Sequence, residues 1–184
     1  FVSTGQGILG NNMFAYCQNS PVMFVDTSGY VIELAPGATD EEIEQYERAI
    51  AYLQQSETGK KLIEKLRNSE VTFKIIFIHD HDTNFNLDTN YISFDPTSGT
   101  VLSDRYSTQS AALALAHEMG HASHSLNPVS HFCMSLGLTN FMEQLNLFQY
   151  ETPIAVDLGE PTRKYYRDAV GVRRMGNSTQ YLKL

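Results

Sequence analysis

The pattern H-E-M-G-H at residues 117–121 constrains this chain more than any other feature of its sequence. On an α-helix, side chains four positions apart lie above one another on the same face. His117 and His121 can therefore each direct an imidazole nitrogen toward one metal ion, and this pair predicts zinc. Glu118 follows the first histidine, where its carboxylate could take a proton from water and pass it to a leaving amine.

The residues around this motif predict a helix. Ser107 or Thr108 is expected as its N-cap, and the pair at residues 127–128, Asn-Pro, is expected to end it, because the residue before a proline avoids the helical conformation. Apolar residues continue through the motif at Ala111, Leu115, Met119 and Ala122. The motif is therefore expected on a largely buried helix.

The other histidines of this part of the chain are expected to be surface or capping groups. His124 and His131 follow the motif, but the third histidine of an extended H-E-x-x-H-x-x-G-x-x-H site would stand where Asn127 lies. The run H-D-H-D at residues 79–82 alternates across a strand end, so its histidines and aspartates would point to opposite sides. We expect an exposed turn there.

A catalytic zinc needs a third protein ligand and leaves its fourth position to water. Residues 139–150 predict a helix with Glu143 in its first turns, whereas Glu151 stands just before a short helix that Thr152 and Pro153 would open. The acidic candidates downstream of the motif are Glu143, Glu151, Asp157 and Glu160. The spacing alone does not decide whether Glu143 or Glu151 is the third ligand, since both would lie on nearly one face of a continuous helix.

Residues 40–184 predict one α+β unit with a short mixed sheet. We expect helices over 41–55 and 57–67, a strand over 71–78, and a hairpin of 91–95 with 100–104. The first helix has Thr39 or Asp40 as its cap. The strand at 91–95, just ahead of the metal helix, is a candidate edge for pairing with an extended peptide.

Charge and composition exclude several classes of partner. The net charge is −8 and only 13 residues are Lys or Arg, so neither nucleic acid nor an anionic membrane is expected as the main partner. No apolar run approaches the length of a membrane span. Residues 1–30 carry too few apolar side chains to fold alone, and residues 31–39 are expected to form a linker.

The opening segment resembles a known protein family. The run G-I-L-G-N-N-M-F-A-Y-C-Q-N-S-P-V-M-F-V-D-T-S-G-Y is similar to the end of the core domain of Rhs/YD-repeat proteins, although Thr27 stands where that family usually has proline. In those proteins a β-cage of repeats precedes a variable toxin domain. The resemblance implies that residues 1–30 end such a core, that residues 40–184 are its toxin domain, and that the β-cage of the parent chain is a partner.

A second resemblance covers residues 108–168. H-E-M-G-H-A-S-H, together with Y-E-T-P-I-A-V-D-L-G-E-P-T-R-K-Y-Y, resembles the M91-type zinc metallopeptidases and the related toxin domains of polymorphic toxins. The clostridial neurotoxin light chains share the succession of metal helix, ligand glutamate, supporting glutamate, arginine and tyrosine. By this resemblance Glu143 would be the third zinc ligand, Glu151 would hold Arg163 or orient a ligand histidine, and Arg163 and Tyr166 would stabilise the oxyanion.

The sequence thus leads to a small zincin-like α+β domain that acts as a zinc-dependent endopeptidase toxin. It would be secreted or delivered into a target cell, cleave a protein there, and have a cognate immunity protein in the producing cell. One alternative is a zinc hydrolase of a non-peptide amide or ester, because the same metal and Glu118 would serve that reaction. Another is an inactive zincin-like binding module.

Overall fold

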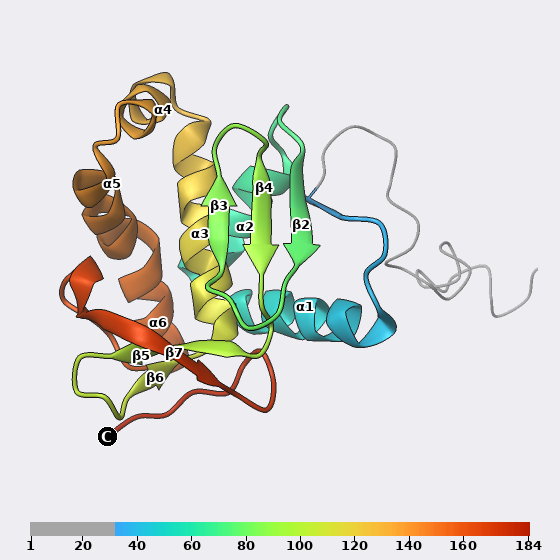
Figure 1. The fold of residues 1–184 in the computed structure, drawn as a ribbon. Coiled ribbons are helices and arrows are strands. Elements are labelled where there is room, and N and C mark those ends of the chain that lie inside the picture. Colours follow the sequence, from blue (N-terminus) through green and yellow to red (C-terminus); the bar gives the residue numbers. More distant parts are fainter. Residues whose placement is uncertain (1–31) are drawn as a thin grey trace, which may run out of the picture.

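The computed structural model describes residues 32–184 and shows an α+β fold with two small sheets (Figure 1). The expectations for residues 1–30 lie outside these described residues. The elements are β1 (Ile32–Leu34), α1 (Asp40–Leu53), α2 (Glu57–Arg67), β2 (Phe73–Phe77), β3 (Asn84–Asn86), β4 (Tyr91–Phe94), β5 (Ser98–Leu102), β6 (Thr108–Gln109), α3 (Ala111–Ser125), α4 (Pro128–Ser135), α5 (Thr139–Asn146), a π-helical turn (Leu147–Glu151), α6 (Thr152–Leu158), a 3-10 turn (Tyr166–Asp168) and β7 (Ala169–Arg174). Over residues 32–184, no helix combines the length and hydrophobicity that a membrane crossing would need.

The first two helices agree with the sequence prediction. Thr39 caps α1, and its side chain and Glu42 form a capping box in which each accepts from the backbone of the other. Ser56 caps α2 by accepting from the backbone N–H of Gly59 at 3.3 Å. Both caps satisfy amide groups that have no partner inside the helix, so the starts of α1 and α2 follow from local sequence.

The larger sheet is mixed, as predicted, with the strand order β1-β2-β4-β3. β1 and β4 are parallel to β2, and β3 is antiparallel to β4. Residues 32–34, expected within a linker, form β1, because the carbonyl and amide groups of this stretch pair with Phe73–Ile75 of β2. Such pairing with a distant strand leaves no trace in the local sequence.

The predicted hairpin is wrong, because β4 and β5 belong to different sheets. Between them Asp95 accepts from the backbone and hydroxyl of Thr97 through Oδ1, and from the backbone of Asp80 through Oδ2. This turn carries the chain into the second sheet, whose order is β6-β5-β7. β4 is also an interior strand, so the edge expected at residues 91–95 is wrong, and within residues 32–184 the edge strands of this sheet are β1 and β3.

Helix α3 begins later than predicted. Its N-cap is Ser110, which accepts from the backbone of Leu113, whereas Thr108 pairs with β5 and with Leu182 in the second sheet. The β-sheet pairing therefore displaces the cap by two residues from Thr108. The end of the helix is as predicted, and Asn127 at that point also caps α4.

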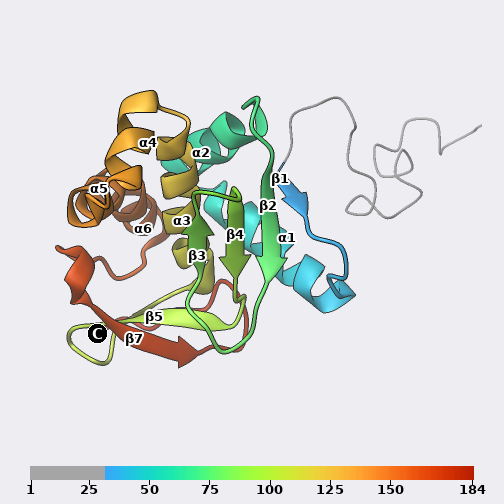
Figure 2. The same ribbon diagram turned by 45° about the horizontal axis from the view of Figure 1, so that its top comes forward.

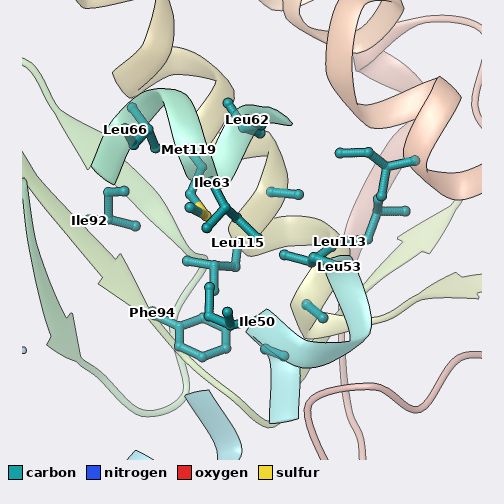
Figure 3. Packing of buried hydrophobic residues seen from close by; sticks show 14 of the residues in the cluster. Ile50, Leu53, Leu62, Ile63, Leu66, Ile92, Phe94, Leu113, Leu115 and Met119 are labelled. Carbon is teal, nitrogen blue, oxygen red and sulfur yellow. The ribbon is translucent and has the colours of Figure 1, made fainter. Parts of the chain in front are cut away.

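The apolar core lies between the larger sheet and helices α1, α2 and α3 (Figure 3). Ile92 and Phe94 of β4 face Leu115 and Met119 of α3, and all four side chains are fully buried. α3 is buried around almost its whole circumference, since the larger sheet lies on one side and α5 and α6 lie on the other (Figures 1 and 2). The helix that carries the metal motif is consequently held rigidly from all sides.

The chain from Thr139 to Leu158 is continuously helical, with a π-helical turn between α5 and α6. Thr152 is therefore a helical residue and not the predicted N-cap, while Gly159 ends α6 in the left-handed conformation at φ 74°. The expectation that a continuous helix places Glu143 and Glu151 on nearly one face was inexact, because in a regular α-helix they would point about 80° apart. The wider π turn reduces this angle, so both glutamates face α3.

Candidate metal centre

Three side chains converge at the middle of α3. Nε2 of His117 lies 2.9 Å from Oε2 of Glu143, Nε2 of His121 lies 3.0 Å from the same oxygen, and the two nitrogens are 3.2 Å apart. Both histidines are buried, and Glu143 reaches them from α5. These three ligand atoms form a group that could hold a metal ion, and it is the only such group found within residues 32–184.

His117 is oriented by a second glutamate. Its Nδ1 lies 2.7 Å from Oε2 of Glu151, a carboxylate that can only accept, so Nδ1 carries a proton and Nε2 is the nitrogen that faces the cluster. Glu151 is 1% exposed. A carboxylate behind a ligand histidine fixes both the tautomer and the ring orientation.

Glu151 is itself held by a bidentate ion pair. Nε of Arg163 donates to Oε1 at 2.8 Å and Nη2 donates to Oε2 at 2.6 Å, while Nε2 of Gln109 donates to Oε1 at 2.9 Å. All three residues are buried. The structure thus places Glu143 with the histidines, and Glu151 behind His117, where it contacts both Arg163 and His117.

The charges of this group shift several pKa values. Burial lowers the pKa of His117, but the hydrogen bonds to Glu143 and Glu151 outweigh it and raise that pKa to about 10. Burial would raise the pKa of Glu143, yet its contacts with His117 and His121 lower it to about 2. The pKa of Glu151 also lies well below its usual range, where the contacts with His117 and Arg163 overcome burial. The carboxylates of Glu143 and Glu151 are therefore stabilised in their charged forms by positive charge next to them.

Glu118 lies beside the cluster on the side of the β3 edge. Its Oε2 accepts from the backbone N–H of Phe85 at 2.8 Å, which ties the carboxylate to the edge strand. Burial raises its pKa, and His117 and His121 only partly oppose that shift. The carboxylate is in reach of two hollows that open at the cluster, one of about 220 Å³ and one of about 330 Å³.

Tyr166 borders both hollows together with Glu118. Its ring stacks on that of His117 with centroids 5.8 Å apart, and the guanidinium of Arg163 lies 5.1 Å from its centroid. Arg163 also donates through Nη1 to the backbone oxygen of Tyr166 at 3.0 Å. Burial, together with Glu143 and Glu118, raises the pKa of Tyr166, so its hydroxyl stays protonated and can donate.

Two other acidic candidates lie away from the cluster. Asp157 accepts from the hydroxyl of Ser56, the N-cap of α2, at 2.6 Å. Glu160 accepts from the backbone and hydroxyl of Ser110, the N-cap of α3, at 2.7 and 2.6 Å. Both carboxylates therefore secure helix starts. Residues 79–82 form an exposed turn and His131 is exposed, as expected, whereas His124, expected as a surface or capping group, is buried on α3 against Tyr150.

Sequence reasoning did not find Asn146 and Gln109. Asn146 is fully buried, and its Nδ2 donates to the backbone oxygen of His117 at 2.7 Å, which ties α5 to the metal helix. Gln109 directly precedes the N-cap of α3 and supports Glu151. An isolated amide side chain carries no spacing signal, so only the fold reveals these roles.

Gly120 permits the contact between α3 and Asn146, and we expect Gly120→Ala to destabilise the fold. A Cβ at this position would lie 1.9 Å from Oδ1 of Asn146, which is buried and cannot move freely. Overpacking of this kind costs about 1–3 kcal/mol. Urea unfolding measures the loss of stability. Gly171→Ala is the matched control, because a Cβ there meets nothing within 4 Å, and an equal loss in both variants would contradict the interpretation.

Comparison of the chain with protein-family models, with curated proteins and with solved structures finds no match.

Proposed function

We propose that this chain is a zinc-dependent endopeptidase with a zincin-like α+β domain. The observation that carries the proposal is the convergence of His117, His121 and Glu143, with Glu118 at the mouth of the two hollows beside them. Two histidines and a carboxylate are a donor set that zinc takes in peptidases, and a neighbouring glutamate is the base that this chemistry needs.

The donor geometry supports zinc. Ligand atoms about 2.0–2.1 Å from a tetrahedral zinc ion lie about 3.3 Å apart. The three atoms here are 2.9–3.2 Å apart, so a small opening of the triangle would accommodate the ion. Nε2 of His117 already points inward, since Glu151 holds Nδ1, and a bound metal ion would replace the proton on Nε2. His117, His121 and Glu143 would therefore hold the zinc ion.

Zinc bound there would supply Lewis-acid polarisation of a carbonyl group and of a water molecule. Glu118 would accept the proton of the attacking water and later deliver it to the leaving amine. Burial raises its pKa, which brings the carboxylate closer to the range in which one group can both accept and donate a proton. The N–H of Phe85 keeps this carboxylate aimed at the hollows.

Tyr166 and Arg163 would have different tasks. Tyr166 borders both hollows and keeps its proton, so its hydroxyl can donate to the oxyanion that develops on the scissile carbonyl. Arg163 already donates through Nε and Nη2 to Glu151 and through Nη1 to the backbone oxygen of Tyr166. Its main contribution would be to position Glu151 and Tyr166, with its remaining N–H groups available toward the 220 Å³ hollow.

We further propose a biological setting from the sequence resemblances. The domain would be the toxin end of an Rhs-like delivery protein, act on a protein in a target cell, and be neutralised by an immunity protein in the producing cell. The net charge of −8 suits an immunity protein with a basic binding surface.

The decisive experiment measures metal and activity together. The purified full chain is analysed for metal content, and its zinc-loaded and chelator-treated forms are each incubated with a proteome and scanned for new peptide termini. We expect one zinc ion per chain and new termini only from the zinc-loaded form. Zinc without new termini would favour hydrolysis of a non-peptide amide or ester, and absence of zinc binding would reduce the site to a binding module.

Replacing Glu143 tests the ligand set. We expect Glu143→Ala to lower zinc affinity by more than the roughly 10–100-fold that follows loss of a group supporting a ligand. Competition with a chromogenic chelator measures the affinity. Glu64→Ala, on the exposed face of α2, is the control and should bind zinc as the unmutated chain does. Unchanged zinc affinity in Glu143→Ala would remove this residue from the ligand set.

A further inference from the structure

The two hollows beside the cluster differ in chemical character. The 220 Å³ hollow is bordered by Arg163 and Arg167 and by the hydroxyl side chains of Ser98 and Thr100. The 330 Å³ hollow shares Glu118 and Tyr166 with it but extends over His121, and its exposed lining is mainly apolar. Its apolar wall is made by Phe85, Leu87, Met134 and Met142. A peptide that crosses the cluster would thus meet a mixed surface with two arginines in one hollow and a mainly apolar surface in the other.

The apolar hollow lies between the β3 edge and the pair α4–α5, across the metal helix. Phe85 and Leu87 come from β3 and the loop after it, Met134 comes from α4, and Met142 comes from α5. Figure 2 shows β3 on one side of α3 and α4 and α5 on the other. Met142 is almost fully buried, whereas Phe85, Leu87 and Met134 are half-buried and offer apolar surface to an incoming group.

Apart from Glu143 at the cluster, the α4–α5 wall offers no acidic or basic side chain of Asp, Glu, Lys or Arg to a ligand. Between Glu118 and Glu143 the sequence contains no Asp, Glu, Lys or Arg. The charged groups that border this hollow are Asp82, Glu118 and Glu143, all acidic and all at its end toward the cluster or the exposed turn. An acidic side chain would be repelled here by these carboxylates. A polar one would lose its water against a lining that is mainly apolar, where Thr83, Asn84 and Thr139 are the uncharged polar side chains.

From this placement we propose that the 330 Å³ hollow is a specificity subsite for a bulky apolar side chain of the peptide, next to the scissile bond. The proposal rests on the proposed peptidase function and adds a substrate class to it. Met134 and Met142 are suited to this task, because the unbranched thioether side chain adapts to different apolar shapes. Leucine, methionine and phenylalanine would be accepted, and aspartate and glutamate rejected.

Two readouts test the subsite. In the first, the methyl signals of Met134 and Met142, assigned with Met134→Leu and Met142→Leu, are followed by NMR while N-acetylphenylalanine amide or N-acetylserine amide is added to the full chain. We expect both signals to move with the phenylalanine compound only, and the buried Met175 signal to stay in place. In the second, the zinc-loaded chain is given a proteome, and residues beside the new termini are compared.

The cleavage readout has a matched pair of variants. Bulky apolar residues should exceed polar ones by about tenfold or more at one position beside the cut in the unmutated chain. Met134→Glu should abolish that preference, and Val129→Glu, an exposed site on the same helix, should retain it. Leu87→Glu changes the opposite wall of the hollow and should also abolish the preference. The same result from two variants on different walls would show that misfolding of one variant is not the cause.

The outcomes separate this subsite from the peptidase function. Methyl shifts without any cleavage would support the apolar subsite and remove the peptidase proposal. Cleavage without a preferred apolar position, or methyl signals that respond equally to both compounds, would overturn the subsite and leave the peptidase function in place. Loss of the preference in Val129→Glu as well would also overturn it, because that side chain does not border the hollow.

Discussion

Glu118→Gln is expected to lower the rate of peptide cleavage by about 10²–10⁴-fold while the chain still binds zinc. The amide keeps the shape of the side chain and can still accept from the N–H of Phe85, which holds the carboxylate at 2.8 Å. It cannot take a proton from water, and general-base assistance is typically responsible for rate factors of this size. The rate is measured on a peptide taken from a cleavage site found with the unmutated chain.

The control for this variant is its zinc content and its thermal unfolding, both of which should match the unmutated chain. Glu64→Gln, on the exposed face of α2, should keep full activity. A Glu118→Gln variant that retains zinc and cleaves at an undiminished rate would show that another group accepts the proton. A variant that loses zinc would mean that Glu118 helps to hold the metal.

Glu151→Gln is expected to reduce the free energy of unfolding by about 3–5 kcal/mol, because it leaves the charge of Arg163 buried without its partner. Glu151 is 1% exposed and Arg163 is 9% exposed, so water cannot replace the lost carboxylate. The bidentate pair at 2.6 and 2.8 Å and the hydrogen bond to His117 would all be weakened together. Urea unfolding of the zinc-free chain measures this effect without a contribution from the metal.

The same measurement on Glu44→Gln provides the contrast. Glu44 pairs with Arg48 at 2.8 Å on the exposed side of α1, and such a pair contributes about 0–1 kcal/mol. Adding Arg163→Met to Glu151→Gln should recover part of the lost stability, since the uncompensated charge is then removed. Equal losses for Glu151→Gln and Glu44→Gln would show that the buried pair does not support the fold.

The local sequence was sufficient to predict those elements whose formation depends on residues close together in the chain. The bounds of α1 agree with the prediction within two residues and those of α2 agree fully, because Thr39 and Ser56 cap these helices within one turn. The metal helix was also predictable, since the four-residue spacing of His117 and His121 has meaning only on a helix. The hairpin of residues 91–95 and 100–104 failed, because strand partners are chosen across the whole sheet and not by the turn that joins two strands.

By itself, the sequence determined the α+β class, the helical pair His117 and His121 as candidate metal ligands, and the set of acidic candidates for a third ligand. Only the tertiary structure distinguished these candidates: Glu143 reaches both histidines, Glu151 lies behind His117 with Arg163, and Asp157 and Glu160 serve distant helix caps. The physical reason is that the role of a carboxylate depends on which side chains lie next to it in the folded chain. These neighbours depend on the π-helical turn after α5 and on the packing of α5 and α6 against α3. The spacing of residues along the chain does not encode either feature.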